Sequence, residues 1–297
     1  DLPVATASTA STGENAVLNG TLPTASDGDG NVVSYQLVSG PGAGNGNVVV
    51  NPNGSYTFTP GSDFDALAPG ATREVTFTYT ATDNNGGISA PATVTITVTG
   101  TNDAPVAQAA SVSVAEDAAL LSGSVVATDV DANASLTFAL SGTAPAGLTF
   151  NSDGSYSFNA ANSAYQSLGV GQSAVLTIPY TVTDDQGATS TANLVITVTG
   201  TNDAPVAQAA SVSVAEDAAL LSGSVVATDV DANASLTFAL NNPAPAGLTF
   251  NSDGSYSFNA ANSAYQSLGV GQSAVLTIPY TVTDDQGATS TANLVIT

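Results

Sequence analysis

The sequence predicts an all-β protein that consists of three tandem immunoglobulin-like β-sandwich domains in an extended rod. Three observations support this fold class: a repeat with a period of about 100 residues, short runs in which apolar and polar residues alternate, and turn-forming residues about every ten positions. A chain of 297 residues also corresponds to two or three domains by length alone. We therefore expect domains at residues 1–100, 101–200 and 201–297, which we call the first, second and third modules.

The repeat is almost perfect between the second and third modules. Residues 104–197 and 204–297 differ at three of 94 positions, where Ser-Gly-Thr at 141–143 becomes Asn-Asn-Pro at 241–243. The first module follows the same plan more loosely, since its Asn-Gly-Ser-Tyr-Thr-Phe at 53–58 corresponds to Asp-Gly-Ser-Tyr-Ser-Phe one module later. The chain is therefore a tandem array of one structural unit.

Within a module, the alternation of apolar residues with Ser, Thr, Ala or Asn indicates half-buried strands. In the second module we expect strands at residues 112–114, 136–140, 176–182 and 194–198. Turn-forming residues separate them at 116–117, 129–133, 151–154 and 184–187. About seven short strands in about 100 residues is typical of an immunoglobulin-like sandwich.

The composition of the chain excludes several classes of protein. There are 24 acidic residues against one basic residue, Arg73, and the net charge is −23. Such a chain repels nucleic-acid phosphates and anionic lipid head groups, so we expect no nucleic-acid partner and no direct membrane insertion. Because Cys and His are absent, disulfides, thiolate or imidazole chemistry and soft-metal sites are excluded.

The acidic residues gather at turns, whereas the solvent-facing strand positions carry mostly Thr and Ser. In the second module they stand at the entrance (Asp103), after the second strand (Asp129 and Asp131) and at a later hairpin (Asp184). Alternate loops of a sandwich lie at the same end, so we expect these carboxylates to converge. Like charges about 5 Å apart cost about 3 kcal/mol per pair at an effective dielectric of about 20. Ca²⁺, which takes about six to eight oxygen ligands, is the counterion that this pattern indicates.

Each acid taken singly has another interpretation, because Asp, Asn and Gly form turns without any metal. Two features favour a metal for the group as a whole. The Asp-x-Asp-x-Asn pattern at 129–133 recurs at 27–31 in the divergent first module, and the chain encodes almost no cation. The pattern is not an EF-hand loop, since its twelfth position is Leu140 or Val38 where Glu is required.

Two other functions compete with this interpretation. The first module differs most from its neighbours and is the alternative candidate for a glycan-binding or cell-binding module. Sugar sites usually offer an aromatic platform, whereas the aromatic residues alternate along strands and are expected in the core. These residues are Tyr56, Phe58, Tyr156, Phe158 and Tyr180. We do not expect an enzyme, because no His or Lys can act as a base near neutral pH, although carboxylate pairs such as Asp63 and Asp65 occur.

The motifs taken together resemble a known family. The chain contains Thr-Asn-Asp-Ala-Pro at 101–105 and 201–205, Gly-Glu-Asn or Ala-Glu-Asp near each module start, Asp-x-Asp-x-Asn, and Thr-x-Thr-Asp-x-x-Gly before a final strand. As a set, these motifs are similar to those of the cadherin-like VCBS repeats of giant bacterial RTX adhesins. The resemblance covers all three modules. It implies that tandem sandwiches bind Ca²⁺ at their junctions and that long arrays of them form an extender region.

The resemblance also implies ligand sets that combine two modules and their linker. For the first junction it implies Glu14, Asn102, Asp103, Asp129, Asp131 and Asp184. For the second junction it implies Glu116, Asn202, Asp203, Asp229, Asp231 and Asp284. Further candidate ligands in the first module are Asp27, Asp29 and Asp83. The chain departs from cadherins at Gly100 and Gly200, where the cadherin linker has Asp, and it lacks an Asp-Arg-Glu motif, so we expect roughly one to three ions per junction.

A function and a location follow from the same resemblance. We expect calcium-rigidified extender repeats of a bacterial surface adhesin, which project a distal ligand-binding domain for surface attachment or biofilm formation. The neighbouring repeats are then the immediate partners, and the distal domain binds the target. The implied location is the outer surface of a bacterium, after type I secretion and with an outer-membrane anchor. Strands of about ten residues rise about 33 Å, so three modules predict a rod of about 100 Å or more.

Overall fold

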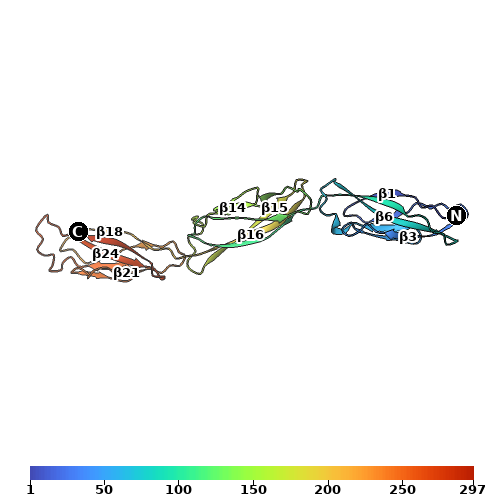
Figure 1. Cartoon of the computed structure of the whole chain (residues 1–297). Coiled ribbons are helices and arrows are strands. Elements are labelled where there is room, and N and C mark those ends of the chain that lie inside the picture. Colours follow the sequence, from blue (N-terminus) through green and yellow to red (C-terminus); the bar gives the residue numbers. More distant parts are fainter.

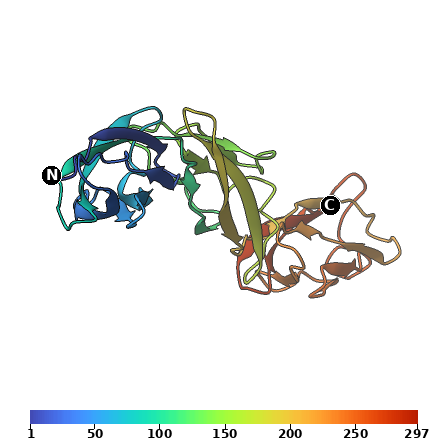
Figure 2. The ribbon, with the colours of Figure 1, turned by 90° about the vertical axis from the view of Figure 1, so that its right-hand side faces the viewer.

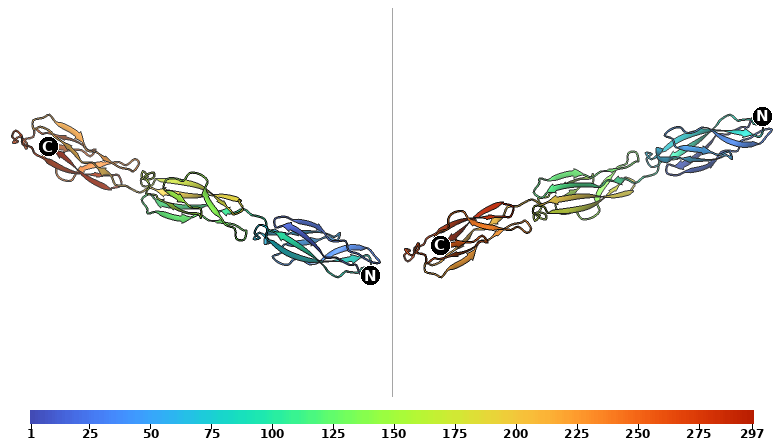
Figure 3. Two further views of the ribbon diagram at one scale, coloured as in Figure 1. Left: turned by 90° about the horizontal axis from the view of Figure 1, so that it is seen from above. Right: turned by 90° about the horizontal axis from the view of Figure 1, so that it is seen from below.

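Three β-sandwiches follow one another in an extended row, with the two termini at opposite ends (Figure 1). The structure is a computed structural model that describes residues 1–297. Views from above and below show the same extended row (Figure 3). A view turned toward the long axis shows the modules displaced from a single straight line (Figure 2). The predicted all-β fold of three tandem sandwiches is confirmed.

The first module has seven strands in two sheets, with the orders β1-β7-β6-β3 and β2-β5-β4. All its strand pairs are antiparallel apart from β1 and β7, which run parallel. The elements are β1 (Ser8–Gly13), β2 (Leu18–Thr21), β3 (Val32–Ser39), β4 (Asn47–Val50), β5 (Ser55–Thr59), the 3₁₀ helix η1 (Gly61–Asp63), β6 (Thr72–Asp83) and β7 (Ala92–Thr99). Beyond η1 the chain has no helix, and none is long and apolar enough to cross a membrane.

The second module has sheets with the orders β12-β15-β16-β9, β10-β14-β13 and β11-β8. Its strands are β8 (Val106–Ala107), β9 (Ala110–Ala115), β10 (Leu121–Ser124), β11 (Ala127–Thr128), β12 (Thr137–Leu140), β13 (Leu148–Phe150), β14 (Ser155–Phe158), β15 (Ser173–Thr183) and β16 (Thr189–Thr199). The runs predicted at 112–114, 176–182 and 194–198 lie within β9, β15 and β16, and the run at 136–140 leads into β12.

The third module repeats this plan, with the orders β18-β25-β24-β21, β19-β23-β22 and β17-β20. Its strands are β17 (Val206–Ala207), β18 (Ala210–Val212), β19 (Leu221–Ser224), β20 (Ala227–Thr228), β21 (Thr237–Leu240), β22 (Leu248–Phe250), β23 (Ser255–Phe258), β24 (Leu276–Thr283) and β25 (Thr289–Ile296). The strands β9 and β18, like β1, run parallel to their neighbours.

Each module buries its own core between its two main sheets. Side chains that alternate inward along the long strands are fully buried, such as Tyr79 and Ile96 in the first module and Ile196 in the second. Burying each such side chain contributes about 1.5–3 kcal/mol. The aromatic residues assigned to the core by their alternation are exposed by no more than 8%: Tyr56, Phe58, Tyr156, Phe158 and Tyr180. These side chains therefore pack the cores and present no platform to a sugar ring.

The modules touch through loops as well as through the linker. At the first junction the Ala132 N–H donates to the Ala66 carbonyl oxygen of the preceding module at 3.3 Å. At the second junction the Ala232 N–H donates to the Ser167 carbonyl oxygen at 3.0 Å. Both donors belong to the turn that carries the Asp-x-Asp-x-Asn pattern, at 129–133 and 229–233. The fold thus places this acidic turn directly against the preceding module.

Candidate metal centres

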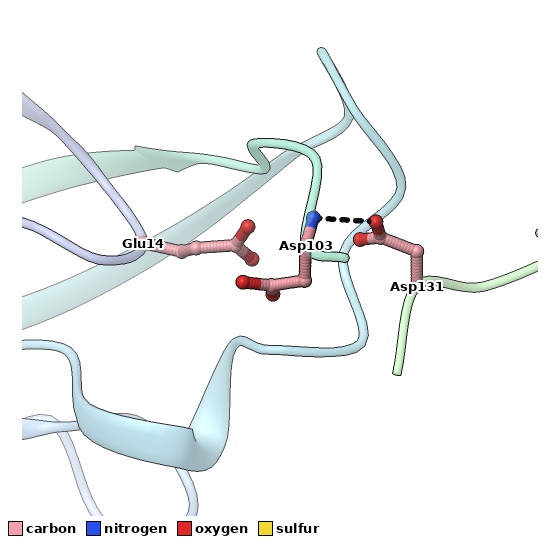
Figure 4. A group of neighbouring side chains, drawn as sticks. All are labelled: Glu14, Asp103 and Asp131. Carbon is pink, nitrogen blue, oxygen red and sulfur yellow. Dashed lines mark hydrogen bonds between the residues drawn. The ribbon is translucent and has the colours of Figure 1, made fainter. Parts of the chain in front are cut away.

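Three carboxylates from three separate segments meet at the first junction. Glu14 directly follows β1, Asp103 lies in the linker, and Asp131 lies in the loop after β11. One carboxylate oxygen of each lies within 4.8 Å of those of the other two (Figure 4). Glu14 is 1% exposed and Asp131 is 7% exposed, so the cluster is shielded from solvent.

Hydrogen bonds hold the linker to both modules at this cluster. The Thr101 N–H donates to Glu14 Oε1 at 2.6 Å, which ties the linker to the first module. The Asp103 N–H donates to Asp131 Oδ2 at 2.9 Å, which ties it to the second module (Figure 4). The Glu14 N–H itself donates to the Thr99 carbonyl oxygen and so extends the pairing of β1 with β7 by one hydrogen bond. Both acids therefore already use one oxygen to position backbone.

The second junction repeats this geometry. Glu116 follows β9 and is fully buried, and its carboxylate lies with those of Asp203 and Asp231 within the same 4.8 Å limit. The Thr201 N–H donates to Glu116 Oε1 at 2.8 Å, and the Asp203 N–H donates to Asp231 Oδ2 at 2.9 Å. Two independent junctions of one chain therefore assemble the same acidic cluster.

Asp129 borders the first cluster without being one of its three acids. Its Oδ1 accepts the Asp131 N–H at 3.0 Å, as expected of a turn-forming aspartate. Its Oδ2 is buried and has no hydrogen-bond partner. Asp229 has the same arrangement at the second junction. These aspartates thus serve the turn with one oxygen and leave the other free for a ligand.

Asp184 and Asn102 are brought to the junction but pair with each other. The Asn102 side-chain amide donates to Asp184 Oδ2 at 2.9 Å, and Asp184 Oδ1 accepts the N–H groups of Gln186 and Ala188. The Asn102 hydrogen bond is the main reason that the pKa of Asp184 lies below its ordinary value. Asn202 and Asp284 form the same pair. These pairs anchor the linker, and neither Asp184 nor Asp284 keeps a buried carboxylate oxygen without a partner.

The remaining predicted ligands lie at the other end of the first module, away from both junctions. Asp29 is exposed and accepts from the backbone nitrogen of Asp1 at 2.8 Å, as Asp131 accepts from the Asp103 N–H in the next module. Both carboxylate oxygens of Asp27 are buried without a partner, and so is Asp83 Oδ2. Asp83 Oδ1 accepts the N–H groups of Asn85 and Gly87. This end of the first module is the structural counterpart of the end of the second module that faces the first junction.

Unpartnered carboxylate oxygens test whether a hard cation fits the two clusters. The first cluster buries three such oxygens, Glu14 Oε2, Asp129 Oδ2 and Asp131 Oδ1. The second buries four: Glu116 Oε2, Asp203 Oδ2, Asp229 Oδ2 and Asp231 Oδ1. A buried polar group without a partner costs about 1–3 kcal/mol, and more when charged. All of these potential metal ligands are oxygen atoms, which Ca²⁺ prefers.

No cationic side chain supplies the missing charge. The Arg73 guanidinium, the only one in the chain, donates to Gly44 and Asn45 within the first module. Burial therefore raises the pKa of Asp131, Glu116 and Asp203 above their ordinary values. The two clusters therefore combine buried carboxylate oxygens at the linkers with no balancing cation.

Three further residues, at these clusters or at the equivalent position of the third module, were not assigned from the sequence. Glu216 is the third-module copy of Glu116, and its Oε2 is also buried without a partner, so the duplication alone would have identified it. Asn15 and Asp117 follow the clustered glutamates and contact the linker, with Asn15 donating to Thr101 Oγ1 and Asp117 accepting from Thr201 Oγ1. Their position next to Glu14 and Glu116 was the available signal.

Close packing explains why glycine stands at the start of each linker. A Cβ at Gly100 would lie 2.4 Å from the Ala68 carbonyl oxygen, and one at Gly200 would lie 2.2 Å from that of Leu168. Both distances are too short for any side chain, and the two carbonyl oxygens belong to backbone that cannot turn away. The position therefore contributes no carboxylate, unlike the aspartate of the cadherin linker.

Comparisons with known proteins agree with this architecture. The bacterial cadherin-like domain matches residues 1–100, 102–200 and 202–297. The crystal structure of human CDH23 EC21-23 superposes with a TM-score of 0.61 at 17% identity, over 99% of this chain and 100% of that chain. Mouse Cadherin-23 EC22-24 gives a TM-score of 0.55 at 17% identity, over 99% and 95%. At these identities the likeness concerns the fold. No curated protein sequence matches the chain.

Proposed function

The chain belongs to the bacterial cadherin-like domain family, and from this premise we propose that its modules form a stalk whose junctions are stiffened by Ca²⁺. The observation that carries the proposal is the set of buried, unpartnered carboxylate oxygens at both junctions. The proposed ligands at the first junction are Glu14, Asp103, Asp129 and Asp131. Those at the second junction are Glu116, Asp203, Asp229 and Asp231.

A bound cation supplies the positive charge that these clusters lack. Glu14 belongs to the first module, Asp103 to the linker and Asp131 to the second module. If all three ligate one cation, the modules can move relative to each other only by breaking bonds to that cation. Without that constraint, a short linker such as residues 100–103 lets neighbouring domains move with considerable freedom. Asn102 and Asp184 add a metal-independent bond that holds the linker in place.

The expected stabilisation is large enough to control the shape of the chain. A ligand at about one to ten times its Kd stabilises the form that binds it by about 0.4–1.4 kcal/mol per site. Extracellular calcium modules bind with Kd values of about 10⁻⁴–10⁻³ M. In about 1 mM calcium such sites are about 50–90% occupied, and at the low free calcium of a cytosol they are empty. The stalk is therefore ordered outside the cell and loose inside it.

We assign the stalk to the extender region of a bacterial RTX-type adhesin, with module boundaries at residues 100 and 200. The tandem motifs of the sequence support this assignment, and so does the near-identity of the second and third modules. An acidic chain without cysteine that stays loose at low calcium is suited to passage through a narrow type I secretion channel. On this proposal the repeats hold a distal adhesive domain away from an outer-membrane anchor, for surface attachment or biofilm formation.

Small-angle scattering and thermal unfolding of the full chain, in millimolar Ca²⁺ and in excess EDTA, test the stiffening. We expect chelation to lower the melting temperature and to convert an extended particle into a bent or flexible one. Magnesium at the same ionic strength separates ion binding from charge screening. Unchanged scattering and unchanged melting after chelation would rule out the metal assignment while leaving the fold intact.

A double variant sharpens this test. Glu14→Gln together with Glu116→Gln removes one proposed ligand from each junction, and we expect its scattering to respond to Ca²⁺ only at higher concentrations. The matched control is Glu74→Gln, which makes the same substitution at an exposed strand position away from the junctions. An equal calcium response in all three proteins would contradict the assigned ligands.

A further inference from the structure

The long strand β15 of the second module is paired along only part of one edge. Strand β16 pairs with all of Ser173–Thr183, whereas β12 and the residue that follows it reach only residues 179–183. The alternation of an antiparallel ladder directs the N–H and C=O groups of Val175 and Thr177 toward the open edge. No backbone hydrogen bond outside the β15–β16 ladder involves either residue. The edge therefore offers free donors and acceptors to another strand.

A groove runs beside this open edge in both the second and the third modules. In the second module its volume is about 360 Å³, and it lies between residues 175–179 and the loop 142–145. In the third module the corresponding groove has a volume of about 250 Å³. Val175 is 63% exposed and Val275 is 62% exposed, so each groove has an apolar side chain in contact with solvent. An open edge with exposed apolar residues is a site for strand addition.

The first module secures the same region with its only basic residue. Arg73 is the counterpart of Ala174 in the second module. Arg73 pairs with Val98, and Ala174 pairs with Val198, which is the same position one module later. The Arg73 guanidinium donates to the Gly44 carbonyl oxygen and lies 4.2 Å from the centre of the Phe64 ring. It thereby fastens the loop that crosses between the sheets.

The next residue of the strand also protects the first module against the addition of a further strand. Glu74 of the first module corresponds to Val175, so a charge stands where the other modules expose valine. Charged side chains on edge strands oppose the addition of further strands. The edge pairing itself ends at the same place in all three modules, because Ser39 pairs with Thr78 and the N–H groups of Ser141 and Asn241 donate to the Pro179 and Pro279 carbonyl oxygens. The first module thus protects with Arg73 and Glu74 an edge that the other two leave exposed.

The differences between the two otherwise identical modules fall at this groove. Residues 141–143 and 241–243 carry all three substitutions, and positions 142, 143, 242 and 243 line the two grooves. The two grooves therefore share an edge and an exposed valine but have different rims. Such an arrangement suits two related binding sites with different preferences.

We propose that the open edges of β15 and β24 bind an extended segment of another protein, which adds to the sheet as a further strand. The backbone groups of Val175 and Thr177 provide affinity, and the exposed valine selects apolar residues at alternate positions of the segment. No charged residue lines either groove, yet the chain carries a net charge of −23. A second copy of the chain is therefore repelled, and a segment flanked by Lys or Arg is attracted.

A labelled peptide of sequence Lys-Thr-Val-Thr-Val-Thr-Lys is a suitable probe for the full chain in millimolar Ca²⁺. We expect saturable binding by fluorescence anisotropy at two sites per chain, and slower hydrogen exchange at Val175 and Thr177. A peptide with Glu in place of both Lys residues should bind at least tenfold more weakly. Binding should persist in EDTA, because each edge lies within one module, which separates this proposal from the calcium stalk.

Two variants locate the peptide. Val175→Glu with Val275→Glu installs the residue of the first module and should weaken binding at least tenfold. Thr177→Pro with Thr277→Pro removes one edge donor and leaves the ladder to the neighbouring strand intact, so it should also weaken binding. The control, Val126→Glu with Val226→Glu, changes the charge equally at exposed valines outside the groove.

Three results would overturn the proposal. The first is peptide binding that the Val175→Glu, Val275→Glu variant leaves unchanged. The second is weakening of equal size in the Val126→Glu, Val226→Glu control, which would assign the peptide to general electrostatic attraction. The third is self-association of the chain that Val175→Glu with Val275→Glu abolishes, because the occupant would then be a second copy.

Discussion

The two junctions share three clustered acids but differ in the residue after the glutamate. At the first junction this residue is Asn15, whose side-chain amide donates to Thr101 Oγ1 at 3.0 Å and to Asp103 Oδ1 at 3.4 Å. The amide thus gives one clustered acid a neutral hydrogen-bond donor. At the first junction, the Asn15 amide therefore compensates part of the negative charge without a metal.

At the second junction an acid replaces that amide. Asp117 accepts a hydrogen bond from Thr201 Oγ1 at 2.9 Å and donates nothing to Asp203, whose Oδ2 is buried without a partner. The pKa of Asp203 is raised, first by burial and then by the charge of Asp117. At this position, the change from an amide to a carboxylate makes the second junction more repulsive when it is empty. Since the affinity of calcium sites rises with the charge of their ligands, it also favours tighter calcium binding there.

The largest expected effect is the loss of fixed geometry on chelation, and it should be larger at the second junction. The chain contains no cysteine, so one exposed serine in each flanking module can be changed to Cys and labelled without interference. We expect the distance distribution between two spin labels to broaden across both junctions in EDTA, and to broaden more across the second. Equal broadening would show that Asp117 adds no repulsion.

Removing a clustered glutamate should separate the junctions from each other. Glu116→Gln should weaken calcium binding at the second junction about tenfold, or about 1.4 kcal/mol, and leave the first unchanged. Glu14→Gln should do the reverse. Calorimetric titration with Ca²⁺ resolves the two classes of site. If either variant weakened both junctions equally, the sites would be coupled and the comparison between them would fail.

Exchanging the neighbouring residues should have a smaller effect, of roughly threefold to tenfold in calcium affinity. Asp117→Asn should weaken the second junction, and Asn15→Asp should strengthen the first, so that the double variant reverses their order. The same titration measures both. Junction affinities that ignore the exchange would place the difference outside these two residues.

The smallest expected effect concerns pH in the absence of metal. Burial raises the pKa of Glu116. The stability that this group contributes is therefore fully present below its unfolded pKa and is lost as the pH rises through its folded pKa. In EDTA, Glu116→Gln should melt above the parent chain by a few degrees near pH 7.5, and the difference should shrink toward pH 4.5. A difference that grows on acidification would have the wrong sign for a buried, repelled carboxylate.

The sequence alone was sufficient for the modular plan and the cores. Alternation along 176–182 and 194–198 identified strands that the structure contains, and it assigned Tyr180 to the core. Turn chemistry placed Asp129 and Asp131 in a loop. These are properties of a few consecutive residues, because a strand repeats every two positions and a turn spans about four. They can be read locally whatever the rest of the chain does.

Only the tertiary structure decided which acids share a site. Glu14 and Asp131 belong to separate modules and meet because the linker is bonded to both, whereas Asp184 is occupied by Asn102. The open edge of β15 was equally invisible in the sequence, since it depends on where β12 stops pairing. Contacts of this kind are set by how separate elements pack and end, and no local periodicity encodes that.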